Sequence, residues 1–180
     1  MKSMTEISKL IAMVLRHKPE ALDLTLDEHG WCSTDALVGR INARQPFSIA
    51  DLQRIVETDG KQRYSFSEDG TRIRANQGHS IPVDVELPEA TPPTVLYHGT
   101  ATRFVESICS AGLQPRSRLY VHLSADVETA EIVGKRHGKP AIFTVDAAQM
   151  AADGCTFYLS RNGVWLTKAV PPQYLTLMNE

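Results

Sequence analysis

The sequence predicts an α+β fold made of two lobes, because its hydrophobic pattern changes twice along the chain. Apolar residues recur at helical spacing as far as Val56, and the spacing then changes to two, which is typical of strands. After a proline-rich segment, short apolar runs of strand length alternate with helical stretches. A length of 180 residues suits one medium domain or two small ones.

The first predicted helix is the best marked in the chain. Ser3 and Glu6 have the spacing of a capping box, which satisfies two backbone N–H groups at a helix start. The apolar residues that follow form one helical face: Ile7, Leu10, Ile11, Val14 and Leu15. Pro19 should end this helix, because the residue before a proline disfavours the helical conformation.

Two further helices and a hairpin complete the first lobe, which we place at residues 1–80. A second helix is expected to begin near Ser33 and a third at Ser48. Residues 63–67 and 71–74 then alternate on either side of an Asp-Gly turn, which indicates a β-hairpin. Three short helices followed by a hairpin resemble a winged helix.

A linker and a strand-rich second lobe follow. Residues 81–93 hold four prolines and three acidic residues, and we expect them to be extended. The second lobe, residues 94–180, should be a mixed α/β unit, with glycines ending its helices. Its strands are expected at 94–97, 119–123, 140–145, 155–160 and 163–167, and its helices near 102–110 and 126–136.

Composition excludes several classes of protein. The formal net charge of −2 argues against a broadly basic surface, so any nucleic-acid contact must come from a local cluster. The three cysteines Cys32, Cys109 and Cys155 are far apart, and none has metal-ligand spacing. No apolar run approaches the roughly 18 residues of a membrane helix. We therefore expect a cytoplasmic protein with reduced thiols, no metal and no membrane contact.

Cations at the end of the first helix are the first candidates for a site. Arg16 lies nearly opposite the apolar stripe and His17 lies at its edge, followed by Lys18. These residues either complement the helix dipole or bind an anion, and the segment alone leaves both possibilities open.

The hairpin carries further candidate cations. Lys61 and Arg63 open it, and Arg72 and Arg74 leave one face of its second strand. This is either a solvated hairpin or a phosphate-binding patch, since guanidinium groups match phosphate oxygens bidentately. The polar run that follows contains His79 and is equally typical of a loop and of a site.

Polar residues also gather at strand ends in the second lobe. His98, Gly99 and Thr100 follow the apolar run 95–97, where a ligand could approach the backbone closely. Residues 118–124 alternate, which places four polar side chains on one face: Arg118, Tyr120, His122 and Ser124. This segment is either an edge strand with a solvent-exposed polar face or the wall of a cleft.

With these residues assembled, the chain resembles the NAD-dependent RNA 2'-phosphotransferase family over nearly its whole length. The likeness rests on motifs that occur in order across both lobes: LRH at 15–17, HGW at 29–31, KQRYSF at 61–66, RANQGHS at 74–80, YHGT at 97–100, VHLS at 121–124, and NGVWLT and VPPQYL near the end. One departure is Tyr120, where the family commonly has a histidine two residues before the position of His122.

The resemblance implies a winged-helix RNA lobe joined to an ADP-ribosyltransferase-like lobe. It also implies a reaction in two steps without metal, with NAD+ as co-substrate. An internal RNA 2'-phosphate attacks C1'' of the nicotinamide ribose and expels nicotinamide, which gives an ADP-ribosylated RNA 2'-phosphate. The ribose 2''-hydroxyl then attacks phosphorus and releases RNA 2'-OH and ADP-ribose 1'',2''-cyclic phosphate.

The same resemblance assigns residues to roles. The catalytic set would be Arg16, His17, Arg63 and Arg118, with His17 either donating a proton to the leaving RNA 2'-oxygen or binding phosphate. The NAD contacts would be His98, Gly99, Thr100, His122 and Ser124. Weaker candidates for RNA or phosphate binding are Lys18, Lys61, Arg74 and His79. The expected partners are NAD+ and a tRNA-like RNA in tRNA splicing, and we expect a monomer.

Two other classes of protein remain as alternatives. A winged-helix regulator without catalysis would bind duplex DNA with a steep dependence on salt, which the near-zero charge of the first lobe disfavours. An ADP-ribosyltransferase could act on protein or on nucleic-acid terminal phosphates. Enzymes that modify proteins generally carry a glutamate near the position of Val164, so the valine disfavours that class.

Overall fold

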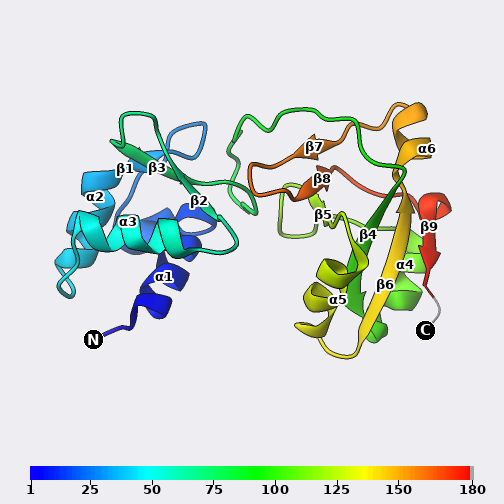
Figure 1. Ribbon diagram of the computed structural model, residues 1–180, viewed down its shortest axis with the longest axis horizontal. Coiled ribbons are helices and arrows are strands. Elements are labelled where there is room, and N and C mark those ends of the chain that lie inside the picture. Colours follow the sequence, from blue (N-terminus) through cyan, green and yellow to red (C-terminus); the bar gives the residue numbers. More distant parts are fainter. Residues whose placement is uncertain (179–180) are drawn as a thin grey trace. The chain divides into compact units, whose positions relative to one another are not determined.

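The computed structural model describes residues 1–178 and is an α+β fold with small antiparallel sheets (Figure 1). The chain divides into two compact units, Met1–Glu86 and Leu87–Glu180. The division falls inside the segment 81–93 that we expected to be a linker. Its first half is bound to the first unit, where Asp84 N–H donates to the Glu28 carbonyl (2.9 Å).

Helices of the first unit begin where their caps predict. The capping boxes of Ser3 with Glu6 and of Ser48 with Asp51 are both formed. The first helix ends before Pro19, which opens a short 3-10 helix instead. The helical elements are α1 (Met4–Arg16), η1 (Pro19–Leu22), α2 (Thr34–Asn42) and α3 (Ile49–Thr58).

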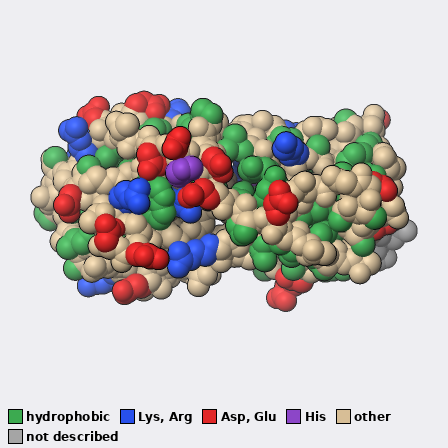
Figure 2. Space-filling view, turned by 90° about the horizontal axis from the view of Figure 1, so that it is seen from above, with side chains coloured by type: hydrophobic (Ala, Val, Ile, Leu, Met, Phe, Trp, Pro, Cys, Tyr) green, Lys and Arg blue, Asp and Glu red, His purple; other side chains and the backbone are tan. Residues whose placement is uncertain are grey.

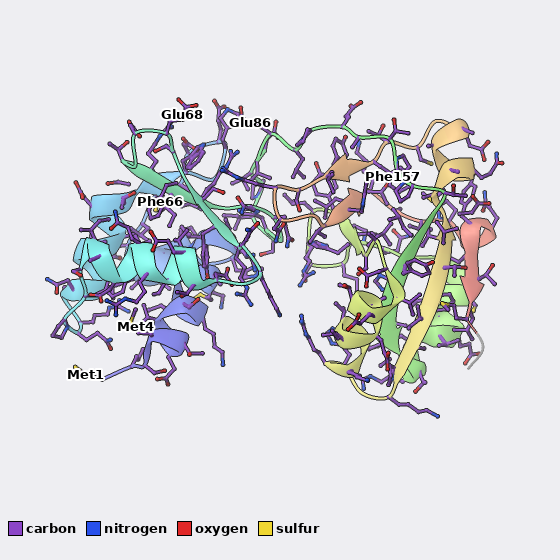
Figure 3. The ribbon with its side chains drawn as sticks, in the orientation of Figure 1. Met1, Met4, Phe66, Glu68, Glu86 and Phe157 are labelled. Atoms are coloured by element: carbon purple, nitrogen blue, oxygen red, sulfur yellow. The ribbon has the colours of Figure 1, made fainter. Side chains whose placement is uncertain are left out.

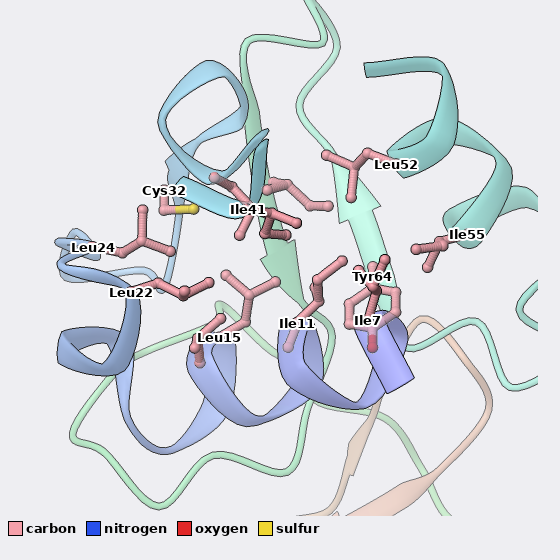
Figure 4. Packing of buried hydrophobic residues seen from close by; sticks show 14 of the residues in the cluster. Ile7, Ile11, Leu15, Leu22, Leu24, Cys32, Ile41, Leu52, Ile55 and Tyr64 are labelled. Atoms are coloured by element: carbon pink, nitrogen blue, oxygen red, sulfur yellow. The ribbon is translucent and has the colours of Figure 1, made fainter. Parts of the chain in front are cut away.

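A three-stranded antiparallel sheet completes the first unit. The predicted hairpin is confirmed, with Phe66 paired to Ile73. A two-residue strand that we did not predict adds to the hairpin, so the order is β1-β3-β2. The strands are β1 (Cys32–Ser33), β2 (Tyr64–Phe66) and β3 (Arg72–Ala75). The apolar face of α1 packs on this sheet and on α3, with Ile11, Leu15 and Leu52 fully buried at its centre (Figure 4).

The second unit contains two three-stranded antiparallel sheets. The strands of one sheet, in order, are β4 (Val95–Ala101), β6 (Pro140–Asp146) and β9 (Leu175–Leu177). Those of the other are β5 (Val121–Leu123), β8 (Trp165–Thr167) and β7 (Tyr158–Leu159). A bridge between Tyr97 and Ser124 connects the two sheets. Phe157, just before β7, is 2% exposed and belongs to the core (Figure 3).

Helices of this unit pack beside the long strands. They are η2 (Thr102–Phe104), α4 (Val105–Ala111), α5 (Val127–Lys135), α6 (Ala147–Ala152) and η3 (Pro172–Tyr174). The glycine stop at Gly112 is confirmed as the C-cap of α4. The prediction of a strand over 119–123 was wrong at its start, because residues 118–120 form a bend and the strand begins at Val121.

Charge on the visible face of the molecule (Figure 2) forms no broad field of one sign. On the face shown in Figure 2, acidic and basic side chains lie close together over the first unit. This arrangement agrees with the formal net charge of −2. A site that binds phosphate must therefore depend on which individual cations lack an acidic partner.

Candidate functional site

A cavity of about 450 Å³ in the second unit contains four of the predicted site residues. It lies between the end of β4, helix α4, the loop 112–118 and β5. His98, Thr100, Arg118 and His122 are among its lining residues. The predicted residues Gly99 and Ser124 are not, and their roles as NAD contacts stay predictions.

The alternation of β4 explains which of its residues reach the cavity. His98 and Thr100 leave one face of the strand, and Gly99 leaves the other. A Cβ atom at Gly99 would lie 1.7 Å from the carbonyl oxygen of Ala130 in α5. Close packing of this helix on the strand therefore explains the glycine by itself. The sequence had suggested instead that a ligand approaches the backbone there.

His98 is held in one tautomer. Its Nδ1 lies 3.1 Å from the carbonyl oxygen of His122, which can only accept, so Nδ1 carries the proton. Burial is the main cause that lowers the pKa of His98, so the ring is neutral. Nε2 is then an acceptor, suited to a hydroxyl or an amide N–H of a ligand.

Arg118 supplies positive charge to the same cavity. Burial lowers its pKa, but an arginine side chain stays protonated in proteins. The Arg118 N–H donates to Pro115 (3.0 Å), which fixes the turn of the loop. Two aromatic rings also line the cavity, those of Phe104 and Tyr120, and the latter stands edge-on to Tyr158 with ring centroids 5.4 Å apart.

Ser124 and Val164, two positions that the sequence analysis singled out, do not line the cavity. Ser124 is held by its backbone, which exchanges two hydrogen bonds with Tyr97 (2.8 and 2.9 Å). Val164 lies in a turn with Ser160, whose hydroxyl accepts from the Val164 N–H (3.0 Å). Val164 is not among the residues that line the cavity.

In the first unit, residues 78–80 hold the Arg16–His17 pair from one side. Ser80 N–H donates to the Arg16 carbonyl (3.0 Å), and the Ser80 hydroxyl lies 2.8 Å from His17 Nδ1. Gly78 has φ of +90°, and a Cβ there would lie 3.5 Å from Arg16 Nε. The sequence singled out 76–80 as a polar run and 74–80 as a family motif but gave Ser80 no role, because that role depends on a contact 63 residues away.

His79 lies inside the first unit. It is 2% exposed, and its Nε2 has no hydrogen-bond partner among residues 1–178. Burial, followed by the charges of Arg16, His17 and Arg74, lowers the pKa of His79 to about 4. It is therefore a neutral buried group at pH 7, and its predicted contact with phosphate stays a prediction.

Arg63 is held by Asp59 and lines a depression between α1 and α3 of the first unit. Asp59 accepts from the Arg63 side chain through an ion pair and from its backbone N–H (2.7 Å). The Asp59 side chain is only 6% exposed, whereas that of Arg63 is 31% exposed. Lys61 and Lys18 are exposed. The spacing of Asp59 four residues before Arg63 was a signal that we had not used.

The two arginines of the predicted phosphate patch on β3 have partners inside the first unit. Their guanidinium carbons lie 5.3 Å (Arg72) and 4.3 Å (Arg74) from the ring centroid of Trp31. Arg72 pairs with Asp27 (3.5 Å) and Arg74 with Glu86 (3.1 Å). These contacts account for both arginines structurally, and a role of Arg74 in RNA binding stays a prediction.

Residues 1–178 contain no candidate metal site and no candidate membrane-spanning helix. No group of three or more histidine, cysteine, aspartate or glutamate residues there could hold a metal ion. No helix in that range is long and apolar enough to span a bilayer.

Comparisons with known proteins place the chain in a family. It matches the RNA 2'-phosphotransferase, Tpt1 / KptA family over residues 2–169. A protein of Hahella chejuensis named "Probable RNA 2'-phosphotransferase" is 52% identical over 179 residues, which cover 99% of this chain and 96% of that protein. A protein of the same name from Agrobacterium fabrum is 53% identical over 174 residues, covering 96% and 94%. This chain therefore belongs to the RNA 2'-phosphotransferase, Tpt1 / KptA family.

Proposed function

We propose that this protein removes an internal 2'-phosphate from RNA by transferring it to NAD+. The observation that carries the proposal is the cavity that His98, Thr100, Arg118 and His122 line together. Membership of the RNA 2'-phosphotransferase family supports the RNA half of the reaction. The cavity supports the NAD+ half, because three of the five residues that the family resemblance assigns to that co-substrate line it, namely His98, Thr100 and His122.

The cavity residues fit a dinucleotide. A volume of about 450 Å³ lies within the range of roughly 300–1,000 Å³ for small-molecule sites. Arg118 offers a planar, permanently charged group for phosphate oxygens. Neutral His98 adds no positive charge against a cationic nicotinamide ring, and its Nε2 is available to accept from a ribose hydroxyl or the carboxamide. Phe104 and Tyr120 offer aromatic surface.

The proposed chemistry has two steps. An oxygen of the RNA 2'-phosphate bonds to C1'' of the nicotinamide ribose as the bond to nicotinamide breaks. The ribose 2''-hydroxyl then bonds to phosphorus, and the bond from phosphorus to the RNA 2'-oxygen breaks. The products are nicotinamide, RNA with a 2'-hydroxyl, and ADP-ribose 1'',2''-cyclic phosphate.

Residues of the first unit have the chemistry that these steps need. Asp59 holds the guanidinium of Arg63, and Ser80 N–H holds the backbone carbonyl of Arg16; guanidinium donors fixed around a developing oxyanion can each contribute about 100- to 1000-fold. His17 could donate the proton to the leaving RNA 2'-oxygen, worth about 100- to 10,000-fold. Its Nδ1 contact with Ser80 orients the ring for that role.

The finer description of the fold belongs to the same proposal. We take the first unit, with its helices and antiparallel sheet, as a winged-helix RNA-binding lobe. We take the second unit as an ADP-ribosyltransferase-like lobe. A cytoplasmic monomer that acts on tRNA-like RNA, without a metal ion, is the matching biological context.

The test is a reaction with NAD+ and an RNA oligonucleotide that carries one internal 2'-phosphate, in the presence of a metal chelator. We expect loss of the 2'-phosphate together with formation of nicotinamide and the cyclic phosphate. Arg118→Gln should slow the reaction strongly, and Arg40→Gln, which removes an exposed arginine 3.9 Å from Asp23, should not.

Three results would contradict the proposal. They are loss of the phosphate without NAD+, no loss with NAD+, and a requirement for added metal. RNA with only a terminal phosphate is a further substrate in the same assay. If ADP-ribose stays attached to that RNA while the internal 2'-phosphate is left intact, the chain is an ADP-ribosyltransferase of nucleic-acid ends.

A further inference from the structure

Helices α1 and α3 of the first unit border a depression of about 340 Å³, which we call the α1–α3 groove. Met4 lies at the α1 side of it (Figure 3). Its lining residues are Met4, Thr5, Ser8, Lys9, Ala12, Arg54, Ile55, Thr58, Asp59, Arg63 and Tyr64. Most of this surface has no part in the proposed chemistry, which uses only Arg63.

The groove is positively charged despite the near-neutral chain. Three cations, Lys9, Arg54 and Arg63, face one carboxylate, that of Asp59. Asp59 is already committed to Arg63 by their ion pair. Among residues 1–178, Lys9 and Arg54 form no ion pair, so the groove keeps two cations whose charged groups are not in contact with a carboxylate.

The helix caps explain why these two cations lack partners. Hydrogen bonds from Ser3 and Ser48 are the main cause that lowers the pKa values of Glu6 and Asp51, and the charges of Lys9 and Arg54 add to the lowering. Each acid is held at its own helix start, where Glu6 accepts from Ser3 N–H (2.7 Å) and Asp51 from Ser48 N–H (2.9 Å). Both carboxylates are thus engaged in capping boxes, and neither forms an ion pair with Lys9 or Arg54.

The residues that line the groove favour binding of a sugar-phosphate backbone over binding of a base. Tyr64 is its only aromatic residue, and it is 4% exposed, with its hydroxyl donating to the Ser8 carbonyl (2.8 Å). A ring so buried cannot serve as a platform for base stacking. Cations beside the small polar side chains of Thr5 and Ser8 suit phosphate oxygens, which are contacted without regard to sequence.

We propose that the α1–α3 groove binds the phosphodiester backbone that flanks the modified nucleotide of the RNA substrate, with Lys9 and Arg54 as the phosphate contacts. This inference rests on the proposed function, in which Arg63 binds the 2'-phosphate. Because Arg63 also lines the groove, the flanking strand would enter it directly from the reacting nucleotide. The groove then supplies affinity that is independent of sequence.

The experiment measures RNA affinity against salt concentration, without NAD+, for two RNAs with one 2'-phosphate each: a dodecamer and a dinucleotide. Each phosphate contact to a single strand contributes about 0.7 to the slope of log K against log salt. Lys9→Gln/Arg54→Gln should therefore reduce the dodecamer slope by about 1.4. Between 50 and 200 mM salt, the double variant should lose about sevenfold less affinity than the wild type.

The controls separate this proposal from the function on which it rests. Arg40→Gln/Arg44→Gln removes two cations of the first unit outside the groove, and the dodecamer slope should stay at the wild-type value. The dinucleotide has no strand to fill the groove, so it should bind the wild type and the groove variant equally. Melting temperatures of both double variants should match that of the wild type, since the four side chains are at the surface.

Two results would overturn the proposal: a wild-type slope in the groove variant, or a loss of affinity as large for the dinucleotide as for the dodecamer. A control variant that lowers the slope equally would also overturn it, because the effect would then follow from total charge. Failure of the proposed function appears separately, as a wild-type protein that leaves the 2'-phosphate of the dinucleotide intact when NAD+ is added.

Discussion

Gly99→Ala distinguishes two reasons for the glycine at the centre of β4. If close packing of α5 requires it, the substitution should destabilise the second unit. If a ligand must approach the backbone there, stability should be unchanged and only ligand affinity should fall. The structure favours the first reason, because the added methyl would lie 1.7 Å from the Ala130 oxygen and 2.6 Å from its carbonyl carbon.

The expected loss of stability in Gly99→Ala follows from the displacement that α5 and β4 would need. Ordinary contacts between heavy atoms lie at about 3.5–4.0 Å, so the helix and the strand must separate by well over 1 Å. Overpacking costs about 1–3 kcal/mol where side chains can adjust. Here the obstacle is the backbone of α5, so we expect at least about 3 kcal/mol. For a unit of this size, that lowers Tm by about 12–24 °C.

Calorimetric melting of Gly99→Ala beside Gly39→Ala measures this. Gly39 lies in α2 with nothing within 4 Å of an added Cβ, so alanine there should raise stability by about 0.5–1 kcal/mol. The same chemical change thus has opposite expected signs at the two sites. A Gly99→Ala protein that melts with the wild type and binds NAD+ more weakly would refute the packing argument and restore the ligand interpretation.

Three further predictions concern Arg63, His98 and His79. Arg63→Lys keeps the charge but loses the planar fork, so turnover should fall about 100-fold or more while the melting curve is unchanged; wild-type turnover would exclude bidentate recognition there. His98→Ala removes the Nε2 acceptor and should raise the KM for NAD+ by up to about tenfold. A large loss of RNA affinity measured without NAD+ would contradict the role of His98 as an NAD+ contact. The folded-state pKa of His79, about 4, is below its ordinary value of 6.5. Between pH 6.5 and 4, the unfolded chain therefore binds a proton at His79 that the folded unit does not. The free energy of unfolding should fall by up to about 3 kcal/mol as pH drops from 6.5 to 4. His79→Gln should flatten this pH dependence of Tm, and a variant with the wild-type profile would show that other groups cause it.

Local chemistry made much of the first unit predictable. The capping boxes at Ser3 and Ser48 depend on residues three apart, so both helix starts were predictable from the sequence. The hairpin was equally local, because an Asp-Gly turn and alternating flanks specify it. Helix α6 was missed, since six residues are too few to show a helical period, although its Asp146 cap was present in the sequence.

Features that depend on long-range contacts could not be predicted from the sequence. The spacing of Arg72 and Arg74 correctly placed them together, but their partners Asp27 and Glu86 lie elsewhere in the chain. The alternation over 118–124 suggested a strand, whereas its first half is a bend that places Arg118 in the wall of a cavity. Periodicity therefore located the polar residues of the site, and only tertiary packing showed which of them face one another.

The pairing of charges, rather than their total, determines where this chain can bind phosphate. A net charge of −2 argues against a basic surface. The total does not distinguish cations that form ion pairs from cations that do not. The arginines beside Trp31 form ion pairs with Asp27 and Glu86, so an RNA phosphate would have to displace an existing ion pair there. Lys9 and Arg54 differ, because neither forms an ion pair among residues 1–178, and Glu6 and Asp51, whose charges interact with theirs, are engaged in helix caps. A phosphate that binds them displaces no ion pair, and for this reason we expect the α1–α3 groove, not the arginines of the hairpin, to carry the salt dependence of RNA binding.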